Sequence, residues 1–162
     1  MTELALTPPR LRRLFQTIDL APLPQDRTIE ESLDMWRKRR GSALAPAAAD
    51  MFRDQTHIVL DHSLLVEPLP GLKDFAIGEV GSAARLLLGQ KYSGDRLSQL
   101  GDRRIAARLR QLCRMVLDYG EAVIVKFGEG NRGYEVLAAP MNTRSGETAL
   151  FCTLTFDDLP VK

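Results

Sequence analysis

The two histidines and the two cysteines of this sequence are the first candidates for a metal site or for thiol chemistry. His57 and His62 lie in an apolar run that predicts a strand, and their odd separation places them on opposite faces of it. They are therefore not expected to share a metal ion. Cys113 and Cys152 are far apart and each has apolar neighbours, which favours buried free thiols over a disulfide or a zinc site.

Adjacent carboxylates and a glycine-rich segment are the other candidates for chemistry. Asp157 and Asp158 follow a predicted strand, which is typical of a solvated surface, and Glu30 and Glu31 lie in a first helical turn, where they complement the helix dipole. The glycines of segment 128–133 stand between two predicted strands, whereas a phosphate loop opens a helix, so a hairpin turn is predicted. No pairing of a nucleophile with a base is left, and we expect a protein that is not an enzyme.

Composition favours one ordinary globular domain. The chain has 162 residues, of which 44% are hydrophobic, and 22 basic against 21 acidic side chains give a net charge of +1. This balance argues against a dedicated nucleic-acid binder. No apolar run reaches the length of about 18 residues that a membrane span needs, and the first residues lack a secretory signal, so a cytoplasmic location is expected.

The N-terminal region predicts a helix set apart from the rest. Leu11, Leu14, Phe15 and Ile18 are spaced as one helical stripe, and a proline-containing linker over 21–24 follows. Residues 1–28 are thus predicted to be a helix and linker for dimerisation or capping, and residues 29–162 a single domain. A short isolated helix is marginal in water, so the stripe packs either on its own domain or on a second copy.

A second helix is predicted from Thr28, which with Glu31 forms a capping box, to the basic run 37–40 before Gly41. Strands are predicted over 57–66 and 73–80, short helical segments over 82–88 and 95–100, and a long helix after Asp102 that ends at Gly120. Strands over 121–127, 134–139 and 149–156 complete the chain. This order predicts an α+β fold, a five-stranded antiparallel sheet with helices on one face and an N-terminal helical extension.

Residues 29–157 resemble the stand-alone PAS family of alphaproteobacteria. The resemblance rests on a helix with Leu33 and Trp36 before the basic run and Gly41, on a Pro-x-x-x-Asp element at 46–50, on Gly81-Ser82 after a strand pair, and on later glycines at 89 and 94. Two features depart from the family pattern. Met51-Phe52 replaces a second proline, and 155–158 lacks the Asp-x-Thr order found where PAS domains drive a fused output.

The resemblance implies a single-domain signalling protein that acts by protein–protein interaction in histidine kinase pathways, as a homodimer. A small ligand between the long helix and the sheet is one option and a ligand-free scaffold is another. The long helix lacks a histidine to ligate haem, and the Asn-Cys-Arg-Phe-Leu stretch of flavin photosensors is absent, so neither cofactor is expected. An enzyme on a cone-like α+β fold is the remaining alternative, and it would need an ionisable residue in the pocket.

Two sets of site residues follow from this interpretation. The candidates for lining a ligand pocket are Leu109, Leu112, Cys113, Val116, Val125, Leu137, Cys152 and Leu154. The candidates for dimer or partner contact are Leu11, Leu14, Phe15, Ile18, Leu33, Trp36, Arg37 and Arg40.

Overall fold

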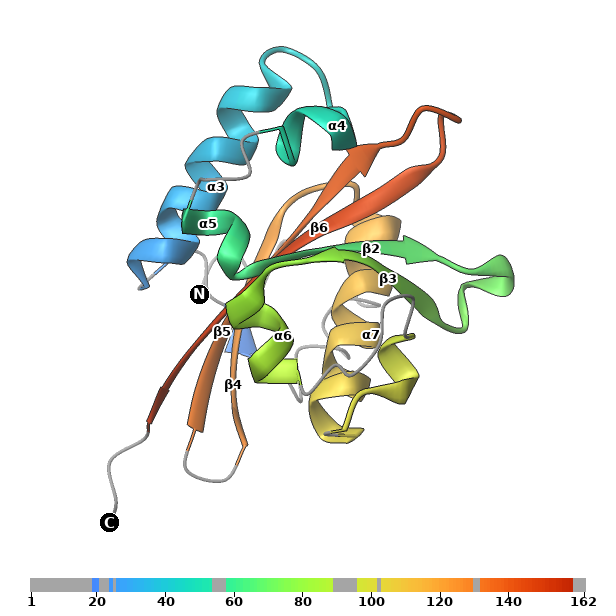
Figure 1. Cartoon of the computed structure of the whole chain (residues 1–162). Coiled ribbons are helices and arrows are strands. Elements are labelled where there is room, and N and C mark those ends of the chain that lie inside the picture. Colours follow the sequence, from blue (N-terminus) through green and yellow to red (C-terminus); the bar gives the residue numbers. More distant parts are fainter. Residues whose placement is uncertain are drawn as a thin grey trace.

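A computed structural model of the chain describes residues 19–20, 24, 26–53, 58–88, 96–101, 103–129 and 132–158. Its centre is one antiparallel sheet with the strand order β1-β4-β5-β6-β2-β3 (Figure 1). The strands are β1 (Asp19–Leu20), β2 (Ser63–Pro68), β3 (Phe75–Val80), β4 (Val123–Glu129), β5 (Arg132–Asn142) and β6 (Thr148–Asp158). The predicted five-stranded antiparallel sheet is confirmed, and the two-residue β1 adds a short edge beside β4.

Helices cover both faces of this sheet, whereas the sequence predicted them on one. The helices are α3 (Arg27–Arg40), α4 (Ala48–Met51), α5 (Ile58–Asp61), α6 (Ser82–Leu88) and α7 (Arg103–Tyr119), with 3-10 turns η1 (Pro70–Leu72) and η2 (Leu97–Gln99). In Figure 1, α3, α4 and α5 lie on one side of the sheet, and α7 lies on the other. We call these the α3 face and the α7 face.

The central strands explain why both faces are covered. In β6, Leu150, Cys152 and Leu154 pack in the core of the α7 face, and the alternate residues Ala149 and Phe151 pack in the core of the α3 face. The alternation was predicted, but only one of the two sets was assigned to a core. Because both sets are apolar, each face must be buried by helices, which gives the domain two hydrophobic layers.

Most helix and strand assignments hold, and two boundaries were wrong. The run predicted as a strand over 57–66 begins with the helical turn α5, and β2 starts only at Ser63. A short apolar run is compatible with helix or strand, so its periodicity did not decide between them. The second helix is capped by Asp26, whose carboxylate accepts the N–H groups of Thr28 and Ile29, and not by Thr28.

Gly81 marks the tight junction between β3 and α6. Its N–H donates to the carbonyl of Ser63 at 2.8 Å. A Cβ atom at this position would lie 2.0 Å from the carbonyl oxygen of Leu60, which is a backbone atom that cannot swing away. Glycine is therefore required here because the end of α5 passes directly against the chain.

Candidate functional site

The α7 face brings together seven of the eight predicted pocket residues. They come from α7, β4 and β6, and all are almost completely buried in one apolar cluster. These seven are Leu109, Leu112, Cys113, Val116, Val125, Cys152 and Leu154. The prediction for Leu137 was wrong, because on β5 it is Val136 and Ala138 that face α7, and Leu137 packs in the opposite layer.

The two cysteines meet across the interface between α7 and β6. Both are free and buried, and the side chains of Cys113 and Cys152 are hydrogen-bonded to each other. This hydrogen bond, together with burial, raises the pKa of the Cys113 thiol well above its usual value. The thiol of Cys113 is therefore protonated at neutral pH, which makes it a packing group and a poor nucleophile.

Of the two histidines, His62 lies among the residues that the structure describes. His57 lies outside the described residues, so the predicted placement on opposite faces of a strand is not addressed. His62 lies at the turn before β2, and its Nδ1 is buried without a hydrogen-bond partner among the described residues. Within these same ranges, no group of three or more potential metal ligands occurs.

The α3 face is organised by residues of the motif that carried the family resemblance. The indole of Trp36 is buried, 1% exposed, and its Nε1–H donates to the carbonyl of Pro140 at 2.9 Å. The Arg40 guanidinium stacks 4.5 Å from the centre of the indole ring and lies 3.8 Å from the Glu121 carboxylate. Arg39 donates from Nη1 to the carbonyl of Asp50, which ties α3 to α4.

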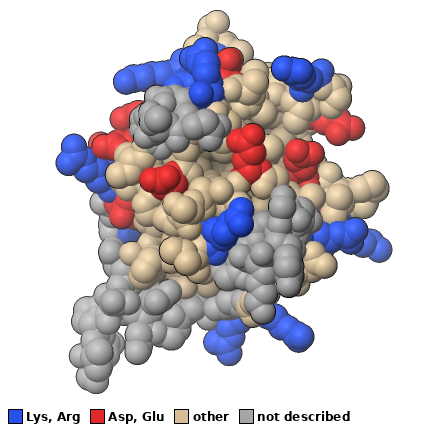
Figure 2. Space-filling model, viewed as in Figure 1, with Lys and Arg blue, Asp and Glu red and all other residues tan. Residues whose placement is uncertain are grey.

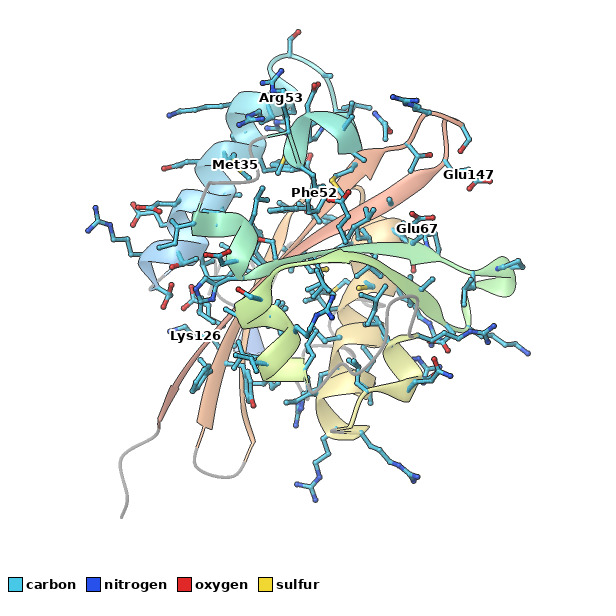
Figure 3. All side chains as sticks on the ribbon, in the orientation of Figure 1. Met35, Phe52, Arg53, Glu67, Lys126 and Glu147 are labelled. Carbon is cyan, nitrogen blue, oxygen red and sulfur yellow. The ribbon has the colours of Figure 1, made fainter. Side chains whose placement is uncertain are left out.

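The Pro-x-x-x-Asp element is a structural part of the same arrangement. The carbonyl of Pro46 accepts the N–H of Asn142 at 2.9 Å, and Ala47 pairs with Asn142 as an isolated parallel bridge at the end of β5. Phe52, which stands in place of the family's second proline, packs its ring edge-on against Phe151 at 5.6 Å. Figure 3 shows Phe52 between α4 and the sheet, with Met35 of α3 in the same layer.

Three buried hydroxyl groups join α3 to the centre of the sheet. Ser63 donates from Oγ to the carbonyl of Val59 at 2.6 Å, and its Oγ lies 2.9 Å from Oγ1 of Thr153. Because Ser63 has one hydroxyl proton, Thr153 donates to Ser63, and Ser32, at 2.6 Å, donates to Thr153. This hydroxyl chain is fully satisfied and fixes one position of α3 on β6 and β2.

A buried carboxylate holds the first turn of α3. Glu135 is 6% exposed, and both of its carboxylate oxygens accept the backbone N–H of Asp26 at 3.3 Å. Lys126, its neighbour across β4 and β5, lies 3.7 Å away. Lys126 is seen in Figure 3 near the N-terminal end of α3, and Arg53 near the C-terminal end.

The residues predicted to contact a partner lie in different environments in the structure. Leu11, Leu14, Phe15 and Ile18 lie outside the described residues. Leu33 and Trp36 are buried against their own sheet, so the idea that they contact a partner was wrong. Arg40 is committed to Trp36 and Glu121, which leaves Arg37, with Lys38, as the exposed basic pair at the end of α3.

Sequence reasoning missed the polar groups that fix α3. Ser32 falls on the apolar stripe of its helix between Ile29 and Trp36, and Thr153 falls in the middle of an apolar strand. A small hydroxyl residue at each of two core positions was the available signal, since buried polar groups require partners.

Comparison with known proteins gave no match, whether against family models, curated proteins or solved structures. In the described part of the chain, no helix is long and apolar enough to cross a membrane.

Proposed function

We propose that this chain is a PAS-type signalling domain that acts by binding other proteins in a bacterial histidine kinase pathway, without catalysing a reaction. The order of its elements supports this: two strands, short helices, the long helix α7, then three strands. The residues that carried the family resemblance support it as well, because Trp36, Arg39, Arg40, Pro46 and Gly81 all make the specific contacts described above.

The observation that carries the proposal is the composition of the α7 face. Its cluster consists of apolar side chains, the Cys113 and Cys152 thiols and the ring of Tyr134. Such an interior offers shape and apolar surface, which suit an apolar ligand or plain packing, whereas acid–base chemistry requires ionisable groups in a pocket. The ligand-bound sensor and the ligand-free scaffold both fit this interior.

In this proposal, partner proteins bind to exposed residues on the surface of the domain. Arg37 and Lys38 are exposed at the end of α3, and charged surface groups of this kind steer association. The stripe of Leu11, Leu14, Phe15 and Ile18 remains our candidate for the homodimer contact, and a cytoplasmic location accords with both roles.

Native mass spectrometry of the full chain tests the dimer and the ligand together. We expect twice the 18.1 kDa mass of one chain, with any retained ligand apolar. A monomer at all micromolar concentrations would refute the dimer. Turnover of a small metabolite, abolished by one substitution in the α7 face, would replace the proposal with the enzyme alternative.

A further inference from the structure

The fold brings the thiols of Cys113 and Cys152 together from positions that are 39 residues apart in the sequence (152 − 113). Cys113 lies on α7 and Cys152 on β6, and their side chains are hydrogen-bonded to each other. The exposed fraction is 0% for Cys113 and 1% for Cys152. Both thiols are free, and the sequence contains no third cysteine that competes as a partner within the chain.

Small side chains beside the pair favour a close approach of α7 to the sheet. Ala106 lies two helical turns before Cys113 on the buried side of α7, and Ala138 of β5 stands opposite Cys152 in the strand register. All four residues pack in the same apolar cluster. A disulfide requires Cα atoms that are about 4.4–6.8 Å apart, and short side chains on both elements favour this separation.

The apolar surroundings favour an uncharged oxidation product over an ionic one. A disulfide carries no charge, whereas a sulfinic or sulfonic acid at Cys152 would ionise in an interior that offers apolar side chains and a second thiol. The same surroundings keep the proton on Cys113, whose pKa is raised by the hydrogen bond and by burial. Oxidation that ends at the disulfide is therefore the outcome that the α7 face accommodates best.

Burial also determines which oxidant reaches the pair. Hydrogen peroxide is small and neutral, so a brief local opening of the α7 layer admits it, whereas glutathione disulfide is large and charged. On the face of the molecule shown in Figure 2, basic side chains lie at several edges and acidic side chains lie between them. That face does not favour an oxidant of one charge, and access to the interior decides the reaction.

We infer that Cys113 and Cys152 are a site of oxidative modification, at which a peroxide converts the two thiols into a reversible intramolecular disulfide. Cys152 reacts first, because Cys113 keeps its proton. The Cys152 sulfur attacks one peroxide oxygen, the O–O bond breaks, and the thiol proton leaves with the other oxygen as water, which yields a sulfenic acid. This inference is independent of the partner and the ligand of the proposed function.

The second step uses the neighbouring thiol. A sulfenic sulfur is a strong electrophile, so the Cys113 sulfur attacks the Cys152 sulfur, the S–O bond breaks, and the Cys113 proton leaves with the hydroxyl group as a second water. In total, two thiols are oxidised to one disulfide and one peroxide is reduced to two waters. The new bond closes a loop that contains β4 and β5, and it fixes α7 on β6.

Intact-mass spectrometry of the purified full chain after treatment with hydrogen peroxide tests the inference. We expect a loss of about 2 Da that dithiothreitol reverses, and a peptide that joins Cys113 to Cys152 after digestion without reductant. Glutathione disulfide at equal concentration should react at least about tenfold more slowly. An equal or faster reaction with glutathione disulfide would overturn the assignment of a peroxide as the oxidant.

The variants Cys113→Ala and Cys152→Ala separate the roles of the two thiols. In Cys113→Ala, no second thiol captures the sulfenic acid, so the chain should gain about 32 or 48 Da as the sulfinic or sulfonic acid. Cys152→Ala should react at least about tenfold more slowly than Cys113→Ala, because Cys113 keeps its proton. Equal rates in the two variants would overturn the order of the steps. Melting curves of both variants confirm that the fold is intact, and the linked peptide from the unaltered chain decides the inference where they do not.

The oxidised chain should unfold at a higher urea concentration than the reduced chain, because the disulfide restricts the unfolded state. Dithiothreitol should return the midpoint to that of the reduced chain. Three results would overturn the inference: a disulfide between two chains as the main product, oxidation that occurs only after unfolding in urea, or a midpoint below that of the reduced chain. None of them affects the dimer and ligand measurements of the proposed function.

Discussion

The two faces of the sheet are both buried, but they are held by different forces. The α7 face is packed by apolar side chains and neutral thiols, and its polar contacts, around Asp74 and Lys73, lie at the rim. The α3 face has directional bonds in its interior, from Trp36 and from the hydroxyl chain through Thr153. Hydrogen bonds fix one position of α3, whereas apolar packing tolerates changes of shape if volume is kept. The α7 face is thus the layer suited to accept a ligand or to shift, and the α3 face is the fixed frame.

Replacing Trp36, which anchors α3 on the sheet, should cause the largest loss in the free energy of unfolding. Trp36→Ala removes a buried indole, its hydrogen bond to the Pro140 carbonyl and the surface on which Arg40 stacks. We expect a loss of about 3–5 kcal/mol in the free energy of unfolding. Trp36→Phe keeps most of the ring and removes the donor, and should cost less. Urea denaturation of both variants measures this, and a loss for Trp36→Ala below about 1 kcal/mol would mean that α3 is not anchored there.

Leu109 tests the apolar layer. Leu109→Ala should cost about 2–5 kcal/mol, because a cavity is left between α7 and the sheet. Leu109→Met conserves volume and should cost less than about 1.5 kcal/mol. If the layer is as adaptable as we argue, an apolar dye or xenon should bind the Leu109→Ala variant and restore part of its melting temperature. An unchanged melting temperature of Leu109→Ala would show that this residue contributes no core packing.

Thr153 lies in the middle of the hydroxyl chain, so Thr153→Val should remove the acceptor of the Ser32 hydroxyl and the donor to Ser63, which keeps its bond to the Val59 carbonyl. We expect a cost of about 1–3 kcal/mol despite the similar size of the two side chains. Ser32→Ala, at the end of the chain, is the control and should cost less. Equal stabilities of the Thr153→Val variant and the unaltered protein would contradict a fixing role for these hydroxyls.

Asp74, at the rim of the α7 face, should make a contribution to stability that depends on pH, unlike the apolar core of that face. Because its folded-state pKa is below the usual 3.8, its ionised form stabilises the fold at pH above that value, and this contribution is lost as pH falls through the folded pKa. Asp74→Asn should therefore be less stable than the unaltered chain at neutral pH, and the difference should shrink towards pH 3. Denaturation curves at both pH values measure the difference, and a difference independent of pH would exclude the ionised carboxylate as the cause.

The sequence allowed the α7 side to be predicted better than the α3 side. The stripe of α7 and the alternation in β6 each specify a buried surface, which is why seven of the eight pocket candidates meet. Leu137 was assigned to the wrong face because β5 has apolar side chains on both of its faces. The sequence of β5 therefore does not show which alternate residues face α7. The hydroxyl chain and the ion pair of Arg40 with Glu121 join segments distant in the sequence, and no local pattern reports them. Asp26 is a local cap, but the capping-box pattern of Thr28 and Glu31 lies two residues further on and favoured the wrong residue.

The most direct test of the account is a kinase assay with the purified protein. Each histidine kinase of the organism that produces this chain is assayed for autophosphorylation with and without an equal amount of the full chain. We predict a changed rate for at least one kinase, and loss of the effect in the variant Arg37→Glu with Lys38→Glu, which should retain the stability of the unaltered chain to within about 0.5 kcal/mol. If no kinase changes its rate and none binds the chain, the proposal of a PAS-type signalling function is contradicted.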